Sequence, residues 1–265
     1  MAAALAVLIW VLTIVITFLF IKAKSYGWWF PELISQYGEI DNQFVRTLIV
    51  TGIAFVASHI ALGYAIFKYR GDAPGKATYS HGNTKLEIIW TAVIAAVFIA
   101  TAFIGQRVWF NLHLTQAPKG AMQIEVVGQQ FAWVFRYPGA DGKFGKTDPT
   151  KINDQDNPLG LVADDPDGKD DLVSRGRIVV PEGEPVELIL RSKDVTHSFF
   201  VPSLRFKQDT VPGLSIKVHF TANKTGEYEV ACAELCGLGH YKMRGVFEVK
   251  KKEDFDKWLK GLKGE

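Results

Sequence analysis

The two cysteines of this chain lie four residues apart in a segment rich in metal-binding side chains. The segment "CAELCGLGHYKM", residues 232–243, holds Cys232, Cys236, His240 and Met243. A disulfide would leave the histidine and the methionine unexplained, and a redox dithiol is more usually spaced Cys-x-x-Cys. Zinc remains open, although methionine is a poor zinc ligand. Two thiolates, an imidazole and a thioether form a soft ligand set that suits copper.

The number of cysteines bears on the number of copper ions. A mononuclear blue-copper site uses one cysteine, two histidines and a weak axial methionine, so this chain has one cysteine too many. If both thiolates bridge two copper ions, each ion needs a histidine of its own. His240 supplies one, and we expect His197, in a loop directly after a strand, to supply the other. The remaining histidines are worse placed: His59 in an apolar run, His81 and His113 beside such runs, and His219 in an expected strand.

The elements that must position these ligands are strands. From Met122 onward, short alternating segments such as "QIEVVGQQFAWVFRY" and "RGRIVVPEGEPVELILRS" are separated by turn residues. Regular spacing of this kind predicts an antiparallel β-sandwich over residues 121–250. Helical periodicity appears in "EDFDKWLKGL", which predicts a short C-terminal helix within residues 251–265.

One segment of this domain does not follow the strand pattern. Residues 139–172, here called the insert, are rich in Asp, Gly and Pro and predict a solvated surface loop. Calcium binding and an acidic docking surface stay open as alternatives, although no EF-hand spacing is present. If the insert docks a basic partner, Asp164, Asp165 and Asp167 are its candidate charges.

The first 110 residues differ from the rest in being dominated by apolar runs. Hydrophobic residues make up 48% of the chain and its net charge is +2, so charge gives no case for nucleic-acid binding. Runs at about 2–21, 47–67 and 86–104 are long enough to span a bilayer. We therefore expect a multi-pass membrane anchor over residues 1–110.

Two features of the anchor concern its processing and orientation. The first run could be a cleaved signal peptide, but it lacks a basic start and a clean small-x-small cleavage site, which favours retention. Lys68, Arg70, Lys76 and Lys85 outnumber Asp72 in the loop before the third run, as expected of a cytoplasmic loop. The C-terminal domain is then external, periplasmic in a bacterium, with the anchor in the inner (plasma) membrane.

The stretch "HSFFVPSLRFKQDTVPG" followed by "CAELCGLGHYKM" resembles subunit II of the haem-copper cytochrome c oxidases. The resemblance covers the second and third apolar runs and nearly all of the external domain. It implies a membrane-anchored, cupredoxin-like Greek-key β-sandwich that holds the dinuclear copper centre CuA. The residues that match the family's copper ligands are His197, Cys232, Glu234 through its backbone carbonyl, Cys236, His240 and Met243.

The same resemblance assigns roles to four further groups. In the family, the Glu234 side chain reaches a magnesium ion at the boundary with the catalytic subunit. The family stretch Gly-x-Gln-Trp-x-Trp, where electrons enter, reads "GQQFAWVF" here, so Phe131 and Trp133 take the aromatic positions. Phenylalanine has no indole N–H to donate, which puts the docking of the donor in doubt. Glu87 matches an acid at the mouth of a proton pathway, although an acid there also complements a helix dipole.

The function that the resemblance implies is electron input to a proton-pumping respiratory oxidase. The chain would accept electrons from a c-type cytochrome, free or held in a supercomplex, and pass them through CuA to haem in subunit I. Other oxidase subunits are expected partners, and the absence of Cys-x-x-Cys-His argues against covalent haem in this chain. Quinol oxidase subunits lack the copper ligands, and nitrous oxide reductase needs a propeller for which this chain has no room. A membrane-tethered copper-binding or copper-delivery module without a catalytic partner is the alternative.

Overall fold

The structure is a computed structural model that describes residues 1–71, 75–76 and 79–262. Asp72, in the loop predicted to be cytoplasmic, and the last three residues of the predicted C-terminal segment lie outside this part of the chain. The chain divides into two compact units, a helical one (Met1–Trp29 and Glu39–Leu112) and a β-rich one (Phe30–Gly38 and His113–Glu265).

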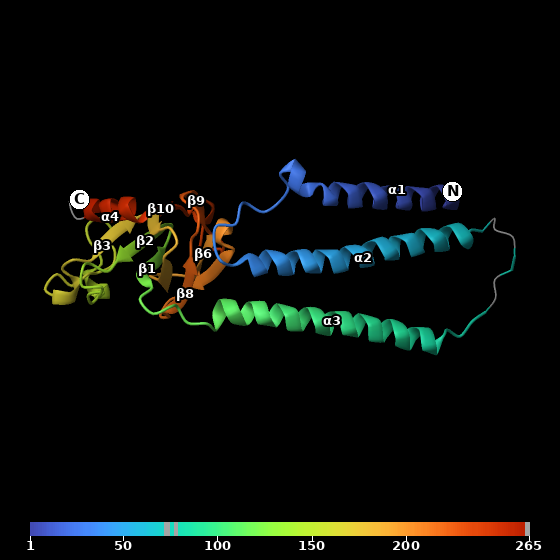
Figure 1. The fold of residues 1–265 in the computed structure, drawn as a ribbon, viewed down its shortest axis with the longest axis horizontal. Helices are drawn as coiled ribbons and strands as arrows, with labels where there is room; N and C mark the ends of the chain where they lie inside the picture. The colour runs from blue at the N-terminus through green and yellow to red at the C-terminus, as the bar shows by residue number, and fades with distance from the viewer. Residues whose placement is uncertain (72–74, 77–78, 263–265) are drawn as a thin grey trace. The chain divides into compact units, whose positions relative to one another are not determined.

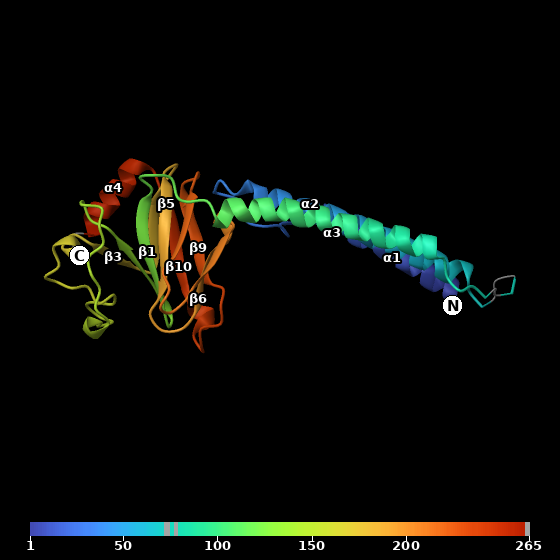
Figure 2. The same ribbon diagram turned by 90° about the horizontal axis from the view of Figure 1, so that it is seen from below.

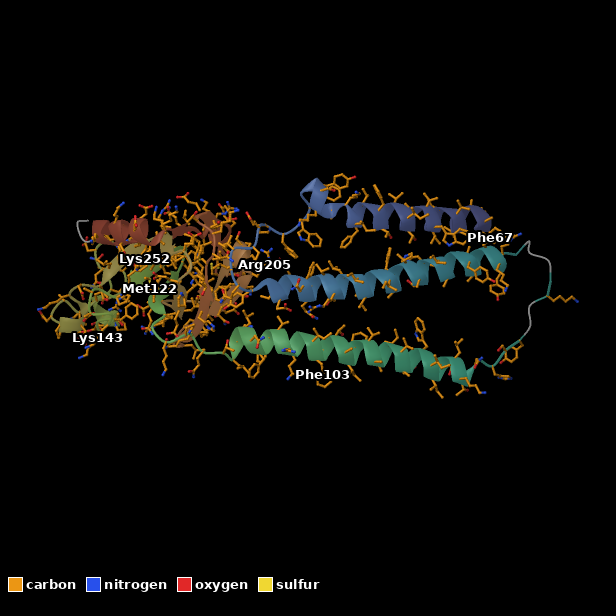
Figure 3. The ribbon with its side chains drawn as sticks, viewed as in Figure 1. Phe67, Phe103, Met122, Lys143, Arg205 and Lys252 are labelled. Atoms are coloured by element: carbon orange, nitrogen blue, oxygen red, sulfur yellow. The ribbon has the colours of Figure 1, made fainter. Side chains whose placement is uncertain are left out.

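The helical unit contains α1 (Ala2–Ile21), α2 (Gly38–Lys68) and α3 (Thr84–His113), each long and apolar enough to cross a membrane. Helices α2 and α3 extend beyond the apolar runs from which they were predicted. The first turn of α2 is acidic, which complements the helix dipole and extends the helix past the apolar sequence. Apolar side chains such as Phe103 stand out from these helices, as expected of surfaces in contact with lipid (Figure 3).

Helices α1 and α2 make a close contact through a tryptophan and a glycine. The Trp10 indole N–H donates to the Ile60 carbonyl over 3.3 Å. The ring also lies where a Cβ on Gly63 would be, so no larger residue fits there without a shift. This close approach explains why Gly63, rather than a larger apolar residue, stands in the middle of an apolar helix.

The strands of the β-rich unit form two five-stranded sheets, ordered β3-β2-β1-β5-β8 and β4-β10-β9-β6-β7. The prediction of a membrane-anchored β-sandwich is confirmed, but the expectation of purely antiparallel pairing is wrong, since β1 pairs with β5 and β4 with β10 in parallel. The bounds are β1 (Met122–Gln129), β2 (Ala132–Tyr137), β3 (Leu172–Arg175), β4 (Arg177–Pro181), β5 (Pro185–Ser192), β6 (His197–Val201), β7 (Phe206–Thr210), β8 (Ile216–Thr221), β9 (Gly226–Cys232) and β10 (Arg244–Lys250).

The core of this unit lies between the two sheets, whose strands are seen from two directions in Figures 1 and 2. The C-terminal helix α4 (Lys252–Gly261) closes one end of the core. Its Phe255 is buried, and its Trp258 ring meets the Tyr137 ring edge-on at 5.4 Å between centroids. Aromatic pairs of this kind stabilise a core beyond the area that they bury.

The connection between α1 and α2 forms part of the β-sandwich. Residues Phe30–Gly38, here called the strap, place Ile34 in the sandwich core. The Ile34 amide donates to the Ser203 carbonyl over 2.9 Å, and its carbonyl accepts from the Asn223 amide over 2.8 Å. The strap and the sandwich therefore share one side of the membrane, which agrees with an external position for the α1–α2 connection.

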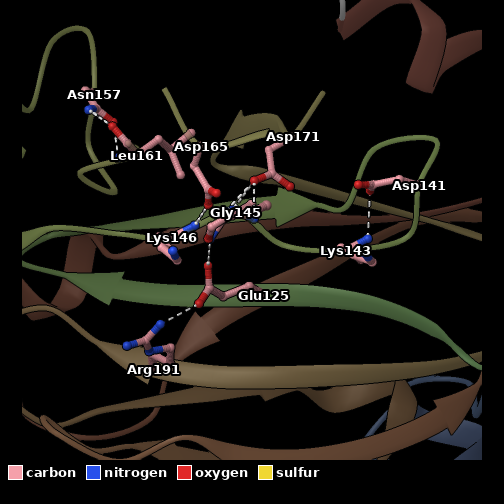
Figure 4. A network of polar contacts seen from close by, with 11 residues as sticks. Glu125, Asp141, Lys143, Gly145, Lys146, Asn157, Leu161, Asp165, Asp171 and Arg191 are labelled. Carbon is pink, nitrogen blue, oxygen red and sulfur yellow. Dashed lines mark hydrogen bonds and ion pairs between the residues drawn. The ribbon is translucent and has the colours of Figure 1, made fainter. Parts of the chain in front are cut away.

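The insert is more ordered than the predicted solvated loop. Around it the Arg136 guanidinium, almost fully buried, pairs with Glu125 at 3.3 Å and also with Asp171. The Gly145 amide donates to Asp171, and the Lys146 amide donates to the buried Asp165 carboxylate over 2.6 Å (Figure 4). These bonds fold the insert onto β1 and β2, and they give Asp165 a structural position rather than an exposed one.

Candidate metal centre

The predicted ligands converge because three neighbouring strands carry them. Cys232 ends β9 and Met243 immediately precedes β10. These two antiparallel strands hold together the ends of residues 232–243, here called the ligand loop. The Cys232 amide donates to the Met243 carbonyl over 3.1 Å. On the other side of β9, β6 pairs Phe199 with Cys232, which brings His197 alongside. The expected loop position of His197 is wrong, because this residue opens β6 and its loop precedes it.

The sulfur atoms form the centre of the cluster. Cys232 Sγ and Cys236 Sγ are 3.9 Å apart, and Cys232 Sγ lies 3.2 Å from the Glu234 carbonyl oxygen. Cys236 Sγ lies 3.7 Å from both His240 Nδ1 and Met243 Sδ. The structure thus brings together the candidate ligand atoms of all five residues from this loop.

His197 completes the cluster from the facing strand. Its ligand atom and the two sulfurs lie within 4.8 Å of one another, and among the described residues they are the group of this kind that could hold a metal. The ring is fully buried, and its Nε2 lies 2.8 Å from Asp194 Oδ1. No described residue offers a hydrogen-bond partner to His197 Nδ1. A buried ring nitrogen without a partner is unusual, and a metal ion bound there would satisfy it.

The surroundings of Cys236 disfavour its charged form when no metal is bound. Burial, with the Cys232 thiol beside it, raises the pKa of the Cys236 thiol to about 11. Both cysteines are free thiols rather than a disulfide. Two thiols, two imidazoles and a thioether fit copper better than they fit a hard cation. Metal binding at this site must release thiol protons.

The two aromatic residues predicted to carry electrons lie at different depths. Phe131, 37% exposed, lies between β1 and β2 with its ring over Gly239 of the ligand loop. Trp133 is fully buried, and its ring centroid lies 6.0 Å from that of His197. Only Phe131 of this pair is exposed enough to contact a docking partner, whereas Trp133 packs against the candidate ligand His197.

Other side chains singled out from the sequence are not among the clustered candidate ligand atoms. Glu87 is in the first turn of α3, where the Asn83 side chain accepts from the Leu86 amide over 3.1 Å. His59 Nδ1 lies 2.8 Å from the Phe55 carbonyl of its own helix. His219 lies in β8, and its own imidazole pKa is lowered by burial. The Glu234 side chain belongs to an exposed residue of the ligand loop.

Two residues next to the ligands were missed by the sequence analysis. Asp194 orients the His197 ring, and Gln130 donates from its side chain to the Cys236 carbonyl. A carboxylate three residues before a candidate ligand histidine was an available signal for Asp194. Gln130 had no comparable signal, because a bond to a backbone carbonyl leaves no pattern of residue types.

Comparisons with known proteins agree with this geometry. A family model described as the periplasmic domain of cytochrome c oxidase subunit II matches residues 122–250. The alternative cytochrome c oxidase subunit 2 of Bradyrhizobium diazoefficiens is 38% identical over 238 residues, covering 89% of this chain and 84% of the relative. Cytochrome c oxidase subunit 2 of Thermostichus vulcanus is 26% identical over 306 residues, covering 94% of this chain and 84% of that relative.

Among solved structures, the periplasmic domain of subunit II of cytochrome oxidase of Bradyrhizobium japonicum is similar. It is 28% identical, covers 56% of this chain and 98% of its own, and has a TM-score of 0.42.

Proposed function

Because this chain belongs to the cytochrome c oxidase subunit II family, we propose that its two sulfurs and two imidazoles hold a dinuclear copper centre. As a member of the family, the chain is the electron-input subunit of a haem-copper terminal oxidase, and a separate catalytic subunit is its partner. Copper binding is the property that the family implies. The number of ions and the identity of their ligands belong to the proposal.

The observation that carries the proposal is the pair of sulfurs flanked by imidazole nitrogens. With Cys232 Sγ and Cys236 Sγ 3.9 Å apart, both thiolates would hold the two copper ions together. His197 would hold one ion and His240 the other, and the Met243 thioether and the Glu234 carbonyl would add weaker ligands. Such a centre, when bound, shares one unpaired electron over both ions and exchanges it with little rearrangement. The protein keeps the ligands fixed by attaching them to neighbouring strands.

The path of the electron to this centre is also proposed. A c-type cytochrome, free or held in a supercomplex, would dock over Phe131, whose exposed ring lies against the ligand loop. Trp133 would act from within the sandwich, next to His197. We also propose that the Glu234 side chain binds a magnesium ion and that Glu87 lies at the entrance of a proton pathway. We place the protein in the plasma membrane of a bacterium, with the β-sandwich outside.

The decisive experiment is a copper count together with an electron paramagnetic resonance spectrum of the purified protein. We expect two copper ions per chain and one unpaired electron split by two equivalent copper nuclei. A spectrum with the splitting of a single copper nucleus at full occupancy would contradict the dinuclear centre. Ready transfer of copper to a metal-free acceptor would instead favour a copper-delivery module.

A further inference from the structure

The candidate ligands reach the metal centre on two separate arms of the chain. The histidine arm runs from Asp194 to His197, the first residue of β6, and its Asp194 carboxylate orients the His197 ring. The ligand loop, residues 232–243 between β9 and β10, is the cysteine arm. The dinuclear geometry requires the two arms to keep a fixed relative position, since an error of an ångström in a ligand atom is enough to alter a metal site.

One residue of the β1–β2 turn bonds to both arms. The Gln130 backbone amide donates to Asp194 Oδ2 over 2.7 Å, while Asp194 Oδ1 holds His197 Nε2 at 2.8 Å. The Gln130 side-chain amide donates to the Cys236 carbonyl. His197 and Cys236 are therefore connected by three hydrogen bonds, two made by Gln130 and one made by the Asp194 carboxylate to His197.

The cysteine arm provides the space that this contact needs. Gly237, directly after Cys236, has φ +136°, a conformation that favours glycine. A Cβ at this position would lie 2.8 Å from Gln130 Nε2, so a larger residue would displace the amide. Gly239 likewise leaves room for the Phe131 ring. Two glycines of the ligand loop thus accommodate the tip of the β1–β2 turn.

We propose that Gln130 is a positioning residue that fixes the cysteine arm relative to the histidine arm. It supplies no ligand and acts through the Cys236 carbonyl, and the inference rests on the proposed function of the two arms as a copper centre. Without the side-chain bond, the backbone at Cys236 loses its hydrogen bond to the β1–β2 turn, while the bond from the Gln130 amide to Asp194 remains. The effect falls on the geometry of the centre rather than on the number of ions bound.

The test compares Gln130→Ala and Gln130→Glu with Gln129→Ala in the full-length, copper-loaded protein. Gln129 is a matched control because it is adjacent and its side chain contacts Lys193 instead of the ligand loop. Both Gln130 variants should keep two copper ions but show altered copper hyperfine splitting. They should also lose copper to a chelator about tenfold faster, the low end of the effect typical of residues that orient metal ligands. Gln130→Glu should be affected more, because its carboxylate oxygen faces the Cys236 carbonyl oxygen.

The other outcomes are equally informative. Spectra and copper loss equal to those of Gln129→Ala would overturn the proposal. It would also be overturned if the metal-free Gln130 variants melted at a lower temperature than metal-free Gln129→Ala, since that would show a general loosening of the sandwich. Gly237→Ala, which displaces the amide from the other side, should change the spectrum in the same direction. A wild-type protein that bound no copper would defeat the proposed function itself, whereas failure of the Gln130 variants alone would leave it standing.

Discussion

His197 is held so that one ring nitrogen is fixed by the protein and the other has no hydrogen-bond partner among the described residues. Asp194 bonds to Nε2, which sets the tautomer and leaves Nδ1 for a metal. The types of the loop residues were enough to propose copper from the sequence. The position of His197 was reached by elimination, and its true setting at the start of β6 depends on pairing with β9, which is remote in sequence.

At the residue scale, Cys236→Ser tests whether the cysteine pair serves the metal or the fold. We expect the dinuclear signal to disappear, because a serine hydroxyl cannot replace a bridging thiolate. The metal-free protein should lose only about 1 kcal/mol of stability, since serine is nearly isosteric with cysteine. The measurements are the paramagnetic resonance spectrum and the thermal unfolding of the metal-free protein. Leu238→Ser, at a 98% exposed position in the same loop, is the control, and unfolding of Cys236→Ser would make the pair structural.

The role of the Phe131 ring requires a comparison of two substitutions. Phe131→Ala removes an aromatic surface but also a contact with Gly239, so it affects the ligand loop as well. Phe131→Leu keeps most of the volume and removes the aromatic ring. We expect turnover with a c-type cytochrome to fall in both variants while the copper spectrum of Phe131→Leu stays intact. Unchanged turnover in Phe131→Leu would place electron input elsewhere on the domain.

At the scale of elements, the insert shows what the sequence pattern could not reveal. Its composition is that of a solvated loop, but Arg136 in β2 forms a buried ion-pair network with it. Arg136→Met should destabilise the protein by about 3–5 kcal/mol, because it leaves Asp171 buried without its cation. Lys143→Met removes an exposed partner of Asp167 and should cost less than about 1 kcal/mol. Denaturant unfolding measures the free energy of unfolding of both variants. Equal decreases in that free energy would mean that the insert is not anchored by Arg136.

The strap is a second element that could not be predicted from the sequence. "FPELISQYG" has neither strand nor helix periodicity, and its fit to the sandwich depends on Ser203 and Asn223, far along the chain. Ile34→Ala should destabilise the full-length protein by about 2–5 kcal/mol, the usual cost of emptying a core site. Glu32→Ala, which removes an exposed pair with Lys224, is the control. If Ile34→Ala lowered the free energy of unfolding no more than Glu32→Ala, the Ile34 side chain would not contribute to the sandwich core.

At the scale of the whole molecule, apolar runs and strand periodicity were sufficient to predict a membrane-anchored β-sandwich. They could not predict which strands pair in parallel, because alternation along a strand carries no information about its neighbour's direction. The positive charges of the loop before α3 gave an orientation, and the strap gives an independent argument for an even number of crossings between the strap and the sandwich. Since the strap lies in the sandwich, the α1–α2 connection must be external if the sandwich is external, and the loop between α2 and α3 must be internal.

This topology is testable by labelling single cysteines in a variant that lacks the native pair, Cys232→Ser with Cys236→Ser. Ser80→Cys lies between α2 and α3, and Lys224→Cys lies in the sandwich beside the strap; both positions are exposed. In right-side-out vesicles, a membrane-impermeant maleimide should label Lys224→Cys at once and Ser80→Cys only after permeabilisation. Inside-out vesicles should give the reverse result, which controls for differences in intrinsic reactivity. Labelling of both positions from the same side would contradict an odd number of crossings between them. The reverse pattern in right-side-out vesicles would place the copper centre in the cytoplasm, beyond the reach of an external c-type cytochrome.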